Sequence, residues 1–207
     1  MPLLSYPLIL ASNSPRRQQL LKEMDFNFTV KVRPTDELFP TDLSPKEVPA
    51  FLAKQKAEQF KHDLKNELIL CADTVVVVDN EILNKPANTD EAKAMLQKLS
   101  GRIHQVITGI CLLNETETQL ETDIAEVFFR QLTDNEIDYY IKNYQPFDKA
   151  GAYGIQEWIG MIGIERIEGS YFTVMGLPTH QVYELLKPYF LPHISLINAE
   201  VNEQGFV

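Results

Sequence analysis

Residues 68–78, LILCADTVVVV, are the most strand-like stretch of the chain. Branched aliphatic residues dominate it, and such residues favour a β-strand. Asp79 and Asn80 follow at once and predict a tight turn into a short hairpin partner. The segment 72–74, with its polar Asp73 and Thr74, breaks the apolar run, so we expect an interruption of the strand at this point.

Helix and strand signals alternate on both sides of this strand. Before it, an apolar run at 8–11 leads into Ser14-Pro15, which predicts a helix through Met24, and Ser44-Pro45 predicts a second helix start. After it, the sequence predicts a helix over 89–99, paired strands over 103–113 and 122–129, a helix from the capping box 133–136 through 140, and a last helix over about 179–189. This alternation is typical of an α/β fold.

The composition is that of a globular protein, with 44% hydrophobic residues in a chain of 207. We expect one domain over 1–190 and a loosely held tail over 191–207. The formal net charge of −10 disfavours binding to nucleic acid or to anionic lipid. A polyanionic substrate would therefore need a local cluster of cations or a metal ion.

Neither a membrane span nor a secretory leader is predicted. No run approaches the roughly 18 apolar residues of a spanning helix, and the N-terminal residues lack the basic segment of a leader. Cys71 and Cys111 lie in apolar runs without a CxxC pair, a context typical of buried cysteines. We expect a cytoplasmic protein.

The segment 12–17, SNSPRR, is the first candidate site. A strand that turns sharply into a helix leaves free backbone N–H groups at the positive end of the helix dipole. Ser12, Ser14, Arg16 and Arg17 would add hydroxyl and guanidinium donors suited to phosphate oxygens. The alternative is an ordinary helix start with two solvated arginines, although arginine in a first helical turn opposes the dipole.

Asp73 is the second candidate. An ionised carboxylate within an apolar stretch is costly unless it is paired, hydrogen-bonded or bound to a metal. Asp73 is therefore a candidate base or metal ligand facing a cleft. The alternative is a bulge or strand end that leaves its side chain in solvent.

Lys56, Lys85 and Gln156 complete the candidates. Lys56 lies near the apolar stripe of its helix, so its ammonium either reaches the surface or points into a cleft. Lys85, before Pro86, would by default lie in a surface turn. Gln156 ends the glycine-containing stretch 148–156, DKAGAYGIQ, and its amide carries the donor and acceptor needed to read a base edge. Taken alone, that stretch is typical of a turn.

Several segments together resemble the Maf family of nucleoside triphosphate pyrophosphatases. The matching segments, in family order, are LASNSPRR (10–17), ADTVVV (72–77), KP (85–86), LSG (99–101), HQVITG (104–109), DKAGAYGIQ (148–156), IEGSY (167–171) and GLP (176–178). One such motif would be weak evidence, whereas the ordered set over about residues 8–190 is highly specific.

The resemblance implies an α/β fold with a mixed elongated sheet flanked by helices and two lobes around a deep cleft, similar to inosine triphosphatases. It also implies a homodimer and hydrolysis of dTTP and UTP, or of modified pyrimidine nucleotides, to the monophosphate and pyrophosphate. A divalent metal cation, Mg²⁺ or Mn²⁺, would assist. Arg16, Thr74 and Gln156 match the branch of the family that resembles enzymes specific for dTTP and UTP.

Residue roles follow from the same resemblance. Asp73 would accept the proton of the attacking water, directly or through a water held by the metal, and Glu37 and Asp73 would bind that metal. The residues expected to bind the substrate are Ser12, Ser14, Arg16, Arg17, Lys56, Thr74, Lys85 and Gln156.

Two other functions stay open. The chain could be a regulator of septum formation that acts through protein partners in cell-division arrest, or a nucleotidyltransferase that also binds nucleoside triphosphates. An assay for pyrophosphate release from dTTP or UTP separates the first from the enzyme. The second would need an acceptor substrate that the sequence does not identify.

Overall fold

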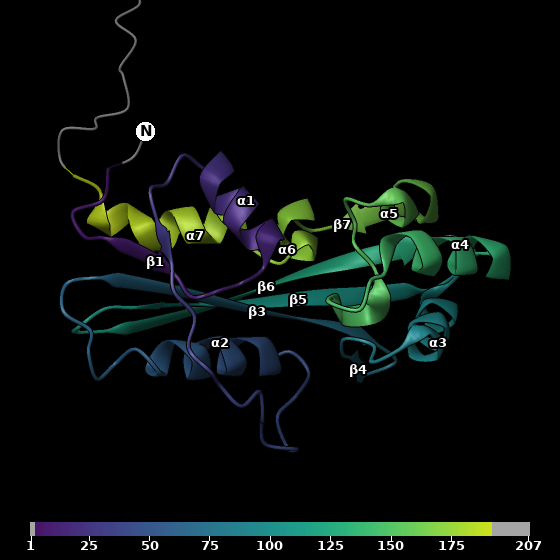
Figure 1. The fold of residues 1–207 in the computed structure, drawn as a ribbon, viewed down its shortest axis with the longest axis horizontal. Coiled ribbons are helices and arrows are strands. Elements are labelled where there is room, and N and C mark those ends of the chain that lie inside the picture. Colours follow the sequence, from purple (N-terminus) through teal and green to yellow (C-terminus); the bar gives the residue numbers. More distant parts are fainter. Residues whose placement is uncertain (1–2, 192–207) are drawn as a thin grey trace, which may run out of the picture.

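A computed structural model describes residues 3–191 and places seven strands in one mixed sheet of order β2-β1-β3-β5-β6-β7, with β4 paired to β3 (Figure 1). The strands are β1 (Leu8–Leu10), β2 (Thr29–Val30), β3 (Leu68–Val78), β4 (Glu81–Leu83), β5 (Ile103–Leu113), β6 (Thr118–Phe129) and β7 (Ile164–Glu168). The long antiparallel strands β3, β5 and β6 give the sheet its elongated form, and β1 joins β3 in parallel. The expected mixed, elongated sheet flanked by helices is confirmed.

Helices cover both faces of the sheet. They are α1 (Pro15–Glu23), α2 (Val48–Glu58), α3 (Thr89–Leu99), α4 (Asp134–Tyr144), α5 (Trp158–Gly163), α6 (Tyr171–Met175) and α7 (Thr179–Leu186), with the short 3₁₀ turns η1 (Ala150–Ala152) and η2 (Lys187–Tyr189). In Figure 1, α2 lies against one face, whereas α1, α6 and α7 lie against the other. The face covered by α1 and α7 buries one large apolar cluster and the face covered by α2 buries two smaller ones, as expected for a sheet packed on both sides.

Strand β3 runs without interruption, so the expected break at 72–74 is wrong. Asp73 pairs in register with Gly109 of β5, and Thr74 pairs with Thr108. Because neighbouring side chains on a strand point to opposite faces, Asp73 meets α2 while Thr74 meets α1 and α6. Each finds a hydrogen-bonding partner on its own face, which removes the cost of placing it in a regular strand.

Gly109 brings α2 close to this point of the sheet. A Cβ atom at Gly109 would lie only 2.2 Å from the backbone nitrogen of Ala50 in α2. The helix can pack directly on β5 only because this residue has no side chain. That close approach places α2 against the face of β3 that carries Asp73, so Lys56 of the same helix contacts the Asp73 carboxylate.

Some boundaries differ from those expected. The helix predicted at Ser44-Pro45 begins at Val48, because the Glu47 carboxylate accepts hydrogen bonds from the backbone and hydroxyl of Ser44 and holds a turn there. β6 starts at Thr118 rather than 122, and α4 continues to Tyr144. The glycine-containing stretch 151–169, for which no helix or strand was predicted, contains α5 and β7.

The turn at Asp79-Asn80, the helix α3 and the capping box of α4 form as the sequence predicts. Cys71 and Cys111 are buried opposite each other on β3 and β5, and both thiols are free. Among residues 3–191, no helix is long and apolar enough to cross a membrane. Of the tail expected from 191, only Leu191 is described, with its backbone donating to Leu3, and 192–207 lie outside the described residues.

Candidate active site

Two adjoining cavities are lined by every residue that was expected to bind substrate or metal. The smaller, of about 80 Å³, is lined by Arg17, Asp73, Thr74 and Gln156 among others. The larger, of about 450 Å³, is lined by Ser12, Glu37 and Lys56. Ser14, Arg16, Lys85 and Asp148 line both cavities and so mark their junction. The fold therefore brings together segments from the N-terminal third, the central strand and the 148–156 stretch.

Lys56 joins the two carboxylates that were expected to bind metal. Its Nζ lies 2.7 Å from Oε1 of Glu37 and 2.5 Å from Oδ1 of Asp73. The Lys56 and Asp73 side chains are 18% and 13% exposed, so this ammonium points into the cleft rather than to the surface. Burial opposes ionisation of Glu37, but the hydrogen bond and charge of Lys56 outweigh it and hold the pKa of that carboxyl below its usual value.

This pair of carboxylates fits a magnesium-like cation. Both Glu37 and Asp73 direct an oxygen at one point, now taken by the Lys56 ammonium. Mg²⁺ and Mn²⁺ favour oxygen ligands, and Mg²⁺ is commonly held by one or two carboxylates together with substrate phosphates. Among residues 3–191 no group of three or more His, Cys, Asp or Glu side chains could hold a metal by itself. Remaining ligands would have to come from phosphate or water.

Arg17 is half-buried and is hydrogen-bonded to protein groups on the opposite face of β3. Its Nε donates to the carbonyl of Gly176 at 2.7 Å, and its Nη2 donates to Oγ1 of Thr74 at 3.1 Å. The third guanidinium nitrogen, Nη1, donates to Oγ of Ser12 at 3.5 Å. Arg17 therefore fastens α1 to α6 and to β3, and the phosphate contact predicted for it stays a prediction.

Thr74 takes part in a directed chain of hydrogen bonds. Oγ1 of Thr108 donates to the carbonyl of Thr173 at 2.9 Å, so its oxygen can only accept from Thr74, 2.9 Å away. Thr74 in turn accepts from Arg17. Its hydroxyl proton is thus directed into the protein, and Thr74 can offer the cavity only an acceptor or its methyl group.

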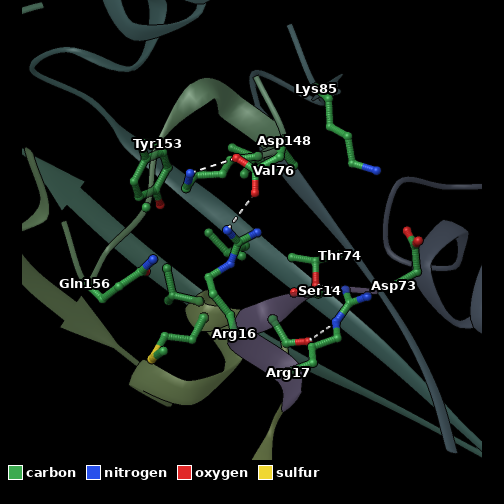
Figure 2. Close-up of a pocket in the computed structure, with 17 residues that line it drawn as sticks. Ser14, Arg16, Arg17, Asp73, Thr74, Val76, Lys85, Asp148, Tyr153 and Gln156 are labelled. Atoms are coloured by element: carbon green, nitrogen blue, oxygen red, sulfur yellow. Dashed lines mark hydrogen bonds and ion pairs between the residues drawn. The ribbon is translucent and has the colours of Figure 1, made fainter. Parts of the chain in front are cut away.

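Arg16 remains open to the cavities on one side. Its Nη1 pairs with Oδ2 of Asp148 at 3.1 Å, and the two side chains point toward each other across the pocket (Figure 2). Lys149 holds the other oxygen of Asp148 at 2.7 Å. Burial raises the pKa of the Asp148 carboxyl, but Lys149 and Arg16 together bring it below its usual value.

Gln156 lies at the end of the smaller cavity away from Asp73 (Figure 2). Its Oε1 is buried and has no hydrogen-bond partner in the described part of the chain. Buried amide oxygens are usually paired, so this acceptor is suited to an N–H of a bound molecule. Tyr153 forms a neighbouring wall and is held by a 2.7 Å contact between its hydroxyl and Nε2 of the buried His104.

Sequence reasoning missed several supporting residues. Thr108, Thr173 and Lys149 are buried polar residues that hold cavity residues in place. Lys149 stands inside the quoted stretch 148–156, beside an aspartate, and that pair of charges next to glycines was the available signal. The threonines carried no signal, because each looks like an ordinary strand or helix residue until its partners are known.

The model of the Maf-like protein family matches residues 7–189, nearly the whole described chain. The chain belongs to the Maf family.

Several proteins with named activities are similar to this chain over most of its length. A protein of Flavobacterium psychrophilum named dTTP/UTP pyrophosphatase is 51% identical over 177 residues, covering 85% of this chain and 91% of that protein. One of the same name from Porphyromonas gingivalis is 48% identical over 188 residues, covering 89% and 94%. Among solved structures, a HAM1 protein from Coxiella burnetii aligns with a TM-score of 0.39 and 17% identity, over 60% of this chain and 73% of that one.

Proposed function

We propose that this protein hydrolyses dTTP and UTP, and modified pyrimidine nucleotides of the same shape, to the monophosphate and pyrophosphate. Family membership and the names of the relatives support this reaction. The observation that carries it is the arrangement around Asp73. A carboxylate held by Lys56 stands between a cavity bordered by cations and a pocket that ends in the unpaired amide of Gln156.

The larger cavity is suited to the triphosphate. Ser12 and Ser14 precede α1, whose first N–H groups and dipole favour an anion. Arg16, Lys56 and Lys85 supply positive charge within the same cavity. This local cluster is what an acidic chain needs in order to bind a polyanion.

Glu37 and Asp73 would hold the divalent cation, Mg²⁺ or Mn²⁺. When bound, such a cation supplies charge neutralisation at the phosphate oxygens. Lys56 would compete with it for the two carboxylates, because the ammonium contacts both of them. A lysine released from these carboxylates is free to pair with phosphate instead.

Asp73 accepts the proton of the attacking water in the proposed mechanism. The water oxygen forms a bond to the α-phosphorus in line, and the bond from that phosphorus to the bridging oxygen breaks. Pyrophosphate leaves with the bonding electron pair, and the proton on Asp73 passes to solvent. Arg16, Lys56 and Lys85 hold the phosphates in line and offset the charge that moves onto the leaving group.

Gln156 reads the base. Its Oε1 would accept from N3–H of uracil or thymine, and its amide nitrogen would donate to O4. Cytosine presents the reverse pattern at this edge. Since Thr74 directs its proton away from the cavity, the donor to O4 comes from Gln156 rather than from Thr74. We expect the larger purine bases to fit less well beside Gln156.

The test is a panel of nucleoside triphosphates with the purified full chain. We expect release of pyrophosphate from dTTP and UTP, weaker release from CTP, and little from ATP or GTP. Methylated and halogenated uracil nucleotides in the same panel identify the preferred pyrimidine. Absence of pyrophosphate release from every pyrimidine, with Mg²⁺ or Mn²⁺ present, would refute the proposal and favour a non-catalytic regulator.

We further propose a homodimer in the cytoplasm, with residues 1–190 forming the catalytic domain. Light scattering should then give twice the chain mass of 23.7 kDa. The role in cell-division arrest stays a prediction.

A further inference from the structure

Lys149 is the only lysine that is buried among residues 3–191, with 7% of its surface exposed. It follows α4 and precedes η1, in the loop that borders the smaller cavity. Burying an ammonium is costly unless carboxylates surround it. Two carboxylates do so: Oδ1 of Asp148 at 2.7 Å and Oε1 of Glu157 at 3.1 Å. Asp148 connects Lys149 to Arg16, and Glu157 connects it to the loop that carries Gln156.

The first connection leads to Arg16. Asp148 binds Lys149 through one oxygen and Arg16 through the other, at 3.1 Å. The Asp148 side chain is 58% exposed, so it has few other contacts to fix it. Lys149, only 9% exposed in its side chain, is the rigid partner of this pair. The position of Arg16 at the junction of the cavities thus depends on Lys149.

The second connection leads to Gln156. The other oxygen of Glu157 accepts a hydrogen bond from the hydroxyl of Tyr140, a fully buried residue of α4. That hydroxyl in turn accepts from the backbone N–H of Gly154 at 3.0 Å. A Cβ atom at Gly154 would lie 2.9 Å from Cδ of Glu157 and 3.1 Å from Nε2 of Gln156, so both side chains lie directly over this glycine. Glu157 and Gly154 therefore fix the loop that carries Gln156.

We propose that Lys149 is a positioning residue for base recognition: it holds Arg16 through Asp148 and, through Glu157, the loop that carries Gln156, and the preference for uracil and thymine depends on it. The inference rests on the proposed hydrolysis of pyrimidine triphosphates. Lys149 acts through its partners and itself contacts no reacting atom. An amide can rotate by half a turn and exchange its donor and acceptor, so a fixed Gln156 discriminates between uracil and cytosine whereas a mobile one does not.

The experiment compares kcat and KM for UTP and CTP in the wild type, Lys149→Met and Lys149→Arg. For Lys149→Met we expect kcat/KM for UTP to fall about ten-fold, mainly through KM, as expected when one buried polar contact is lost. The CTP value should change less, so the preference for UTP falls. Lys149→Arg keeps the charge and should recover most of the preference. Lys93→Met, which removes an exposed lysine paired with Asp138, is the matched control.

A thermal melt of each variant separates folding from recognition. If Lys149→Met does not fold, Lys149→Met/Glu157→Gln removes the excess buried negative charge and is measured in its place. A folded variant that keeps the wild-type ratio of UTP to CTP overturns the inference, and so does failure of both variants to fold, since Lys149 would then serve folding alone. A wild type inactive on UTP and CTP alike refutes the proposed function itself, whatever the variants do.

Discussion

Substitution of Asp73 by asparagine tests the chemical step most directly. The change is nearly isosteric and removes the charge and the basicity of one side chain. Oδ1 of the asparagine can still accept from Lys56, whose Nζ lies 2.5 Å from that atom in the wild type. The backbone at this position is an ordinary rung of the β3–β5 ladder, so the strand gives no reason for rearrangement.

The expected loss in kcat is about 10²–10⁴, the usual contribution of a positioned base. This corresponds to about 3–5 kcal/mol in the activation barrier, at 1.36 kcal/mol for each factor of ten. The cost to folding is much smaller. Removing one partner of a buried ion pair is expensive when the other charge is left alone, but Lys56 keeps Glu37 at 2.7 Å. We therefore expect a change of only about 1 kcal/mol in the free energy of unfolding.

The assay is pyrophosphate release at saturating UTP, together with a thermal melt. With Mg²⁺ or Mn²⁺ in excess, KM for UTP should change little, because Arg16, Lys56 and Lys85 remain in place. Asp138→Asn is the control, since Asp138 also pairs with a lysine, 2.7 Å away, but lies on α4 outside both cavities. Near-normal turnover of folded Asp73→Asn would refute the assignment of Asp73 as base. A loss of activity that follows a collapse of the melting temperature would refute the energetic reasoning.

Three further outcomes are expected. EDTA should abolish pyrophosphate release and added Mg²⁺ or Mn²⁺ should restore it; full activity without a divalent cation contradicts the Glu37–Asp73 site. Gln156→Glu should lower kcat/KM for UTP about ten-fold or more, because a carboxylate cannot donate to O4; an unchanged rate and UTP-to-CTP ratio removes Gln156 from base recognition. Lys56→Met should raise the pKa of Glu37, since burial then acts without the opposing ammonium; a carboxyl NMR titration that finds it unmoved contradicts the pairing.

Local sequence signals predict the fold well where a single segment carries its own signal. Four elements contain the residues that determine their own conformation: β3, the Asp79-Asn80 turn, α3 and the capping box of α4. Tertiary contacts stabilise these elements but do not select their conformation. The short elements β2, β7 and α5 carry no such signal. A strand of two residues, such as Thr29–Val30, exists only because β1 offers it hydrogen-bonding groups.

The Asp73 site shows a different limit. The sequence indicates that Asp73 is a carboxylate within an apolar strand, where its burial is costly, and it predicts an interruption of the strand at that point. The strand instead stays regular, because an ion pair with Lys56 offsets the cost of burying the Asp73 charge. Lys56 belongs to α2, which can approach the sheet only because Gly109 has no side chain. Such compensation depends on tertiary contacts between segments far apart in the chain. Spacing within one segment can indicate that a partner is needed but cannot identify it.

The cations of the site also could not be placed from the sequence, because net charge does not show where charges gather in the fold. The overall charge of −10 argues against a polyanion ligand, but the cavities bring Arg16, Lys56 and Lys85 together. Arg16 and Lys56 are already paired with carboxylates, whereas Lys85 has no ion-pair partner within residues 3–191. Arg16 keeps one side open beside Asp148, but Lys56 contacts two carboxylates, so a triphosphate that binds Lys56 must displace them, and part of its attraction is spent on breaking those pairs. We therefore expect only moderate affinity for so cationic a cavity, which also lets the pyrophosphate product leave.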